Sequence, residues 1–94
     1  YIKKLNLLGV PAFVVSHGDD TAGAIIVKVN KLNGDAVLFE RSFSLDKNLN
    51  QWSKFESGDE KRLDELLSRQ LSRDRDLWIV EIESRQGDPF LDDI

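Results

Sequence analysis

The sequence contains no cysteine, no methionine and only two prolines in 94 residues. The absence of cysteine excludes disulfides and thiolate chemistry, and it suits a protein of the reducing cytoplasm. No apolar run approaches the roughly 18 residues that a membrane-spanning helix needs, and no signal peptide is present, so we expect a cytoplasmic protein without a membrane partner. Because methionine is missing and the chain begins at Tyr1, we expect the natural start to lie further upstream.

Basic residues are outnumbered, with 13 lysines and arginines against 17 aspartates and glutamates and a net charge of -4. A field of this sign repels phosphate backbones, which disfavours nucleic acid as a partner. The apolar fraction of 40% and the charged fraction of 32% are typical of a globular protein. The length predicts one domain over residues 1–94, with residues 86–94 as a loosely held acidic tail.

Apolar periodicity and turn residues divide the chain into two helices and four or five strands. We predict a helix over residues 2–8, strands over 12–15, 24–31, 35–43 and 51–55, a helix over 57–72, and a strand over 77–83. The second helix should begin with Ser57 as its N-cap and Glu60 completing a capping box. Its leucines recur at helical spacing and should pack on a sheet. These are Leu63, Leu66, Leu67 and Leu71.

The hairpin around Asn33-Gly34 allows two registers. A two-residue turn would place Val27 opposite Glu40. A three-residue loop over 32–34, with Gly34 in the left-handed conformation, would place Val27 opposite Phe39. We favour the second register because it collects apolar pairs on one face.

The element order predicts an α+β fold. We expect two layers, with a mostly antiparallel sheet of four to five strands and the helices packed on one face. The order along the chain is α-β-β-β-(β)-α-β.

Two blocks of sequence carry a family resemblance. They are GVPAFVVSHGDDTAGAIIVKVN (9–30), followed by the Asn-Gly hairpin, and DLWIVEIESRQGDPF (76–90). The chain resembles a small family of alphaproteobacterial proteins whose function is unknown. The resemblance implies a short cytoplasmic bacterial protein, and it implies no activity, cofactor or catalytic residue.

The only histidine lies in the run His17-Gly18-Asp19-Asp20. His17 beside Asp19 and Asp20 could act as a general base or as half of a metal site. Glycine and aspartate are also what a turn between strands requires, and a lone histidine has no recognisable metal-ligand spacing. We therefore interpret this run as a turn, and we predict neither catalytic residues nor a metal site.

Three arginines, Arg62, Arg69 and Arg73, fall on the side of the second helix opposite the leucines. They could bind phosphates, although a solvated face with ion pairs is the commoner pattern. Trp52 has polar neighbours and is either part of the core or a partner contact.

These patterns favour a non-enzymatic interaction or accessory module that needs no cofactor. Its partner would be a protein, or a second copy joined through a sheet edge. The alternatives are a small ligand-binding domain or enzyme centred on His17 and Asp19, and weak nucleic-acid binding through the three arginines.

Overall fold

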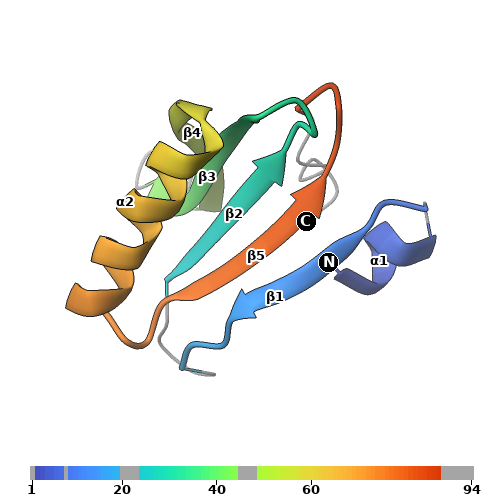
Figure 1. The fold of residues 1–94 in the computed structure, drawn as a ribbon. Coiled ribbons are helices and arrows are strands. Elements are labelled where there is room, and N and C mark those ends of the chain that lie inside the picture. Colours follow the sequence, from blue (N-terminus) through green and yellow to red (C-terminus); the bar gives the residue numbers. More distant parts are fainter. Residues whose placement is uncertain (1, 8, 20–23, 45–48, 88–94) are drawn as a thin grey trace.

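A computed structural model describes residues 2–7, 9–19, 24–44 and 49–87, which form two helices and five strands (Figure 1). Their bounds in chain order are α1 Ile2–Leu7, β1 Ala12–Ser16, β2 Ile25–Asn30, β3 Asp35–Ser44, β4 Leu49–Asp59, α2 Glu60–Arg73 and β5 Trp78–Glu83. The α+β class and the order of elements agree with the sequence-based prediction. The expected tail lies mostly outside the described residues.

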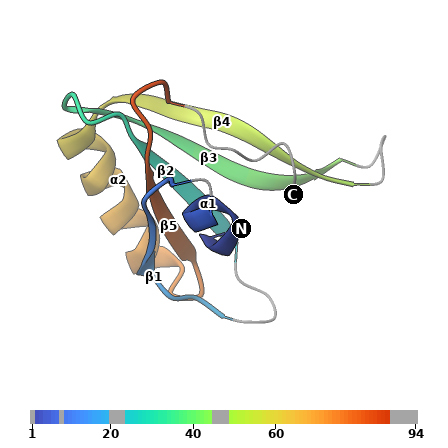
Figure 2. The same cartoon turned by 90° about the vertical axis from the view of Figure 1, so that its right-hand side faces the viewer.

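The five strands form one mixed sheet in the order β1-β5-β2-β3-β4. β5 pairs antiparallel with β1 and parallel with β2, and the β2–β3 and β3–β4 pairs are antiparallel. The last strand of the chain is therefore inserted between the first two. Figure 2 shows β3 and β4 running side by side as the longest strands of the sheet.

Helix α2 covers one face of the sheet with its leucines. Leu63 and Leu67 are buried against Ile26, Leu38 and Ile79, and Leu66 and Leu71 pack at the margin of this cluster. Burial of this apolar surface is the main force that holds the helix on the strands. The predicted role of the four leucines is confirmed.

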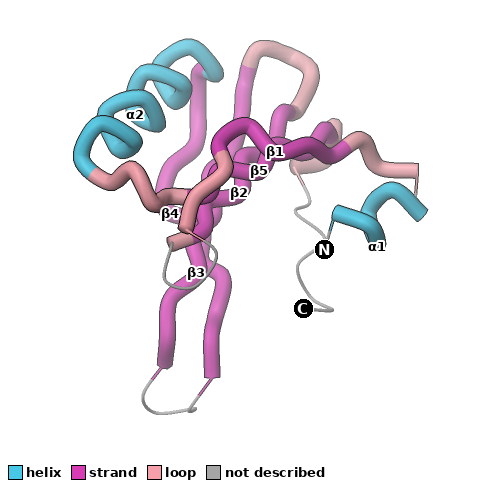
Figure 3. The backbone as a smooth tube through the Cα atoms, turned by 90° about the horizontal axis from the view of Figure 1, so that it is seen from below, coloured by secondary structure: helices cyan, strands magenta, loops and turns pink. Residues whose placement is uncertain are grey.

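Helix α1 lies on the opposite face. Its Leu5 is 1% exposed and packs with Val27, Val29 and Ile82, which alternate along their strands with the residues that face α2. Figure 3 shows the two helices on opposite sides of the strands. The prediction that both helices share one face is wrong, because the central strands bury apolar side chains on both faces.

The hairpin between β2 and β3 has the register that we favoured. Val27 lies opposite Phe39, Val29 lies opposite Val37, and the Lys31 backbone N–H donates to the Asp35 carbonyl oxygen. Gly34 has φ of +93°, as a three-residue loop with a left-handed glycine requires.

Strand β4 is longer than expected and changes the start of α2. Ser57 and Gly58 remain in the strand, opposite Val37 and Ala36. The N-cap of α2 is instead Asp59, whose carboxylate accepts a hydrogen bond from the Arg62 backbone N–H at 3.2 Å. The prediction of Ser57 as the cap is wrong because pairing with β3 keeps that residue extended.

Candidate functional site

Strand β1 forms one edge of the sheet, and no described strand pairs with its outer side. The Glu83 backbone N–H donates to the Pro11 carbonyl oxygen, so residues 11 and 83 form a hydrogen-bonded pair. Hydrogen-bonded pairs alternate along an antiparallel ladder. Phe13 is therefore bonded to Glu81, and the backbone groups of Ala12 and Val14 point outward from the sheet.

The side chains of this edge are apolar and exposed. Phe13, Val14 and Val15 expose 47%, 43% and 52% of their surface. The strand contains no charged residue, although charges are a common means of protecting sheet edges. Pro11 before the strand and the irregular register between Val14 and Ser16 limit the regular part of this edge to a few residues.

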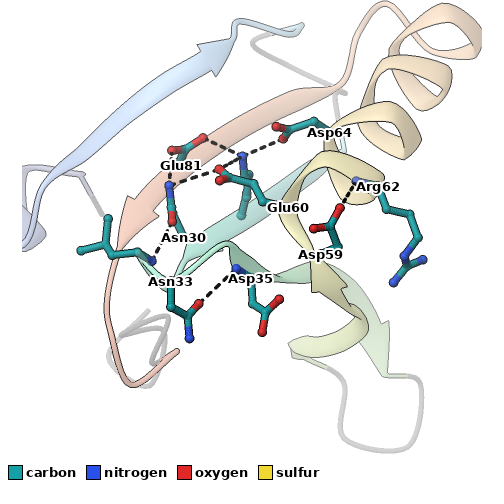
Figure 4. A network of polar contacts seen from close by, with 10 residues as sticks. Asn30, Asn33, Asp35, Asp59, Glu60, Arg62, Asp64 and Glu81 are labelled. Carbon is teal, nitrogen blue, oxygen red and sulfur yellow. Dashed lines mark hydrogen bonds and ion pairs between the residues drawn. The ribbon is translucent and has the colours of Figure 1, made fainter.

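On the sheet face that carries α2, Lys28 of β2 binds three carboxylates, those of Glu60, Asp64 and Glu81 (Figure 4). Its Nζ lies 2.6 Å from Asp64 Oδ1, 2.8 Å from Glu60 Oε2 and 3.2 Å from Glu81 Oε1. Asn30 also donates to Glu60 at 3.1 Å. Glu60 and Asp64 lie one turn apart on α2, so both reach the same side of the helix.

The Lys28 ammonium is kept charged although its side chain is only 5% exposed. Burial by itself would lower the pKa of Lys28, but hydrogen bonds to Asp64, Glu60 and Glu81 outweigh it and raise the pKa above its ordinary value. This lysine is therefore a fixed positive charge at neutral pH. Among the described residues, no group of three or more histidine, aspartate or glutamate side chains is arranged to hold a metal ion.

A groove of about 270 Å³ runs between α2 and β1 and ends at this cluster. Its apolar lining residues are Val15, Leu67, Leu71 and Ile79, and its polar lining residues are Lys28, Asp64, Ser68 and Glu81. We call this hollow the α2–β1 groove. It lies directly beside the exposed edge, since Val15 belongs to both.

The turn that contains His17 packs on the start of β5. The His17 ring lies on the Trp78 ring with 4.0 Å between centroids, and the Trp78 indole N–H donates to the Asp19 carbonyl oxygen at 2.8 Å. The Asp19 N–H in turn donates to the Asp76 carbonyl oxygen. Asp20 lies outside the described residues. His17 and Asp19 are thus near each other, and neither lines the α2–β1 groove.

The three arginines of α2 do not act as one group. Arg62 lies at the helix start, where its guanidinium donates to the Ser57 carbonyl oxygen at 2.8 Å and lies 3.3 Å from the Glu56 carboxylate. Arg69 and Arg73 are exposed further along the helix and line a shallow hollow with Leu66 and Gln70.

The two tryptophans are both partly buried. Trp52 packs against the cluster around Leu5 on the α1 face, which favours its core interpretation over that of a partner contact. Trp78 is part of the packing between β5 and the His17 turn. Neither lies at the β1 edge.

Sequence reasoning missed Lys28, Glu60, Asp64 and Glu81 as a group. A signal was present: Glu60 and Asp64 are four residues apart on one helix, and Glu81 interrupts an apolar strand. Their convergence on Lys28 depends on the parallel β2–β5 pairing, which local sequence does not specify.

The sequence matches the family model described as "Protein of unknown function (DUF1491)" over residues 1–92. The chain belongs to the DUF1491 family. A crystal structure of a DUF1491 family protein from Caulobacter crescentus is 38% identical, with a TM-score of 0.83, and the match covers 97% of this chain and 86% of that one. An NMR structure of a DUF1491 family protein from Caulobacter crescentus gives 38% identity and a TM-score of 0.78, covering 97% and 84%.

A solution structure of a protein from A. tumefaciens is 26% identical, with a TM-score of 0.72, and the match covers 88% of this chain and 77% of that one. No curated protein matches the sequence. The DUF1491 relatives therefore establish the family and the fold, and the family description assigns no function. In the part of the chain that the structure describes, no helix is long and apolar enough to cross a membrane.

Proposed function

We propose that this DUF1491 protein is a non-enzymatic, cytoplasmic interaction module that binds an extended segment of a partner protein along β1. The observation that carries the proposal is the exposed edge at Ala12 and Val14, flanked by the apolar side chains of Phe13 and Val15. An added strand would take up the outward backbone groups, while the side chains give specificity. The cysteine-free composition supports the cytoplasmic assignment.

The opposite edge of the sheet is a weaker candidate. β4 carries Lys54, Glu56 and Asp59, and charged residues on an edge strand discourage pairing with another chain. β1 carries none, so the two edges of one sheet are protected to different degrees.

A short partner segment fits β1 better than a second copy does. The regular edge lies between Pro11 and the irregular register after Val14, too short for two sheets to join over their full length. Each copy would also have a net charge of -4, so two copies would repel each other.

The test is selection of binding peptides from a library of short random sequences displayed on phage, with the full chain as bait. Synthetic peptides from the selection are then titrated into the labelled protein and followed by NMR. We expect the largest changes in the backbone amides of residues 12–16. Changes confined to other surfaces, or a library that gives no peptide binding there, would overturn the proposal.

A proline variant tests whether the outward backbone groups of β1 bind the peptide. Val14→Pro removes an N–H that points outward, so the β1–β5 ladder keeps its hydrogen bonds while a bound strand loses one. Binding should weaken at least about fivefold. Circular dichroism shows whether the variant is folded. If it is unfolded, the NMR changes of the backbone amides in the unaltered protein decide whether peptides bind at β1. A dimer that Val14→Pro dissociates would indicate a second copy as the occupant and contradict the peptide proposal.

A further inference from the structure

We infer that the partner segment inserts a lysine or arginine side chain into the α2–β1 groove. The inference rests on the proposed strand addition at β1 and specifies the chemistry of the strand that is added. It follows from three properties of the groove: its charge, its distance from the edge and its volume.

The charge of the groove is unbalanced. Lys28 is one positive group bonded to three negative groups, Glu60, Asp64 and Glu81, so the cluster has two negative charges in excess. Of these residues, Lys28, Asp64 and Glu81 line the groove, which leaves one excess negative charge in its lining. Asp64 is 53% exposed, so it can accept a further donor from solvent or from a partner. A cationic side chain would balance this excess where a neutral or acidic one would not.

The distance suits a long side chain. A strand added to β1 lies about 4.8 Å beyond it, and hence roughly 10 Å from β5, which carries Glu81. Phe13 lies opposite Glu81 on β1, so a side chain that reaches Glu81 from the added strand must pass the position of Phe13. Lysine and arginine combine an apolar stem with a charged end, and their cations are attracted to aromatic faces.

The volume of the groove is sufficient for one long side chain. Pockets for cofactors and drug-sized ligands have about 300–1,000 Å³, and this groove, with about 270 Å³, lies just below the lower end of that range. A second copy pairing through its own β1 would bring no basic residue, because Ala12–Ser16 contains none. The groove therefore disfavours pairing of β1 with the β1 strand of a second copy, and it favours a partner segment that carries a basic residue.

The experiment uses the peptides selected in the test of the proposed function. We expect one lysine or arginine at a fixed position of the bound register, with apolar residues two positions away on the same face. Replacing that lysine by norleucine, which keeps the stem and removes the charge, should weaken binding about fivefold to tenfold. The same replacement at any other lysine of the peptide should weaken binding less. This difference distinguishes a specific contact in the groove from general electrostatic attraction to an acidic protein.

The protein side of the contact is tested with Asp64→Asn and Glu81→Gln. Each should weaken binding of the lysine peptide more than it weakens binding of the norleucine peptide. Glu65→Gln is the matched control, because it removes the same charge from an exposed residue of α2 that does not line the groove. Equal effects of Glu65→Gln and Asp64→Asn would overturn the inference.

The outcomes separate the two proposals. Peptides that bind at residues 12–16 without a preferred basic position would leave the proposed function standing and refute the inference. A library that gives no peptide at this edge would refute both.

Discussion

Lys28 and Glu81 lie opposite each other on the parallel strands β2 and β5, with Lys28 Nζ 3.2 Å from Glu81 Oε1. Their side chains are 5% and 14% exposed, so the pair is largely removed from water. Glu60 and Asp64 bind the same ammonium from α2. Polar contacts thus link α2 to the β2–β5 pair in addition to the apolar contacts of its leucines.

Replacing Lys28 should destabilise the protein substantially. Lys28→Met leaves three carboxylates near one another without their cation, and we expect a loss of about 2–4 kcal/mol in the free energy of unfolding. Lys61→Met, at an exposed position of α2, should change it by less than about 0.5 kcal/mol. Urea denaturation of both variants provides the measurement. Equal stabilities would show that the cluster contributes nothing to the fold.

Alkaline pH should weaken the protein through the same lysine. The pKa of Lys28 is raised in the folded state, so its contribution is complete below the ordinary lysine pKa of about 10.4 and is lost as pH rises through the folded value. In that window the unfolded chain has released the proton and the folded chain has not, so stability falls by up to about 1.4 kcal/mol per pH unit. The difference in stability between the unaltered protein and Lys28→Met should shrink as the pH rises from about 9 to about 11.5. A constant difference would contradict the assignment.

The cap of α2 is tested by two single substitutions. Asp59→Ala removes the acceptor of the Arg62 N–H and should cost about 1 kcal/mol. Ser57→Ala, at the residue that the sequence pattern indicates as the cap, should change stability by less than about 0.5 kcal/mol because Ser57 remains in β4. Thermal unfolding of the two variants provides the measurement. A larger loss of stability from Ser57→Ala than from Asp59→Ala would show that Ser57 is the cap, as the sequence pattern predicts.

The parts of the fold that sequence predicts well are those set by neighbours along the chain. The β2–β3 register follows from local chemistry. Gly34 adopts φ of +93°, and apolar residues alternate along the strand on each side of it: Val27 and Val29 before the turn, and Val37 and Phe39 after it. The leucines of α2 are likewise specified by helical spacing.

The parts that sequence misses depend on contacts between distant residues. Nothing local indicates that β5 inserts between β1 and β2, and the burial of Lys28 follows from that insertion. The alternation of β5 predicts Glu81 on a polar face, but Ile79 on the same face is buried under α2. Leu5 and Ile82 show why α1 takes the other face, since β5 buries Val80 and Ile82 on that side and Ile79 on the side of α2.

Gly18 should be intolerant of any side chain. A Cβ at this position would lie 2.7 Å from Trp78 Cδ1 and in collision with the Asp76 carbonyl oxygen, which is backbone and cannot rotate away. Gly18→Ala should therefore displace the turn and cost about 1–3 kcal/mol. The Trp78 indole N–H resonance reports the displacement directly. Gly34→Ala, where no atom lies within 4 Å of the added Cβ, should strain its own turn and leave that resonance unchanged.

The contact between the His17 and Trp78 rings should give a modest, measurable coupling energy. His17 is exposed, so His17→Ala should cost less than about 1 kcal/mol. Trp78→Leu removes both the tilted ring contact with His17 and the hydrogen bond to the Asp19 carbonyl oxygen, and it should cost more. In a double-mutant cycle the two changes should be non-additive by about 0.5–1 kcal/mol, as for other aromatic pairs. If the two changes are additive within about 0.3 kcal/mol, the rings lie next to each other without stabilising each other. Another interaction would then have to explain why His17 lies over β5.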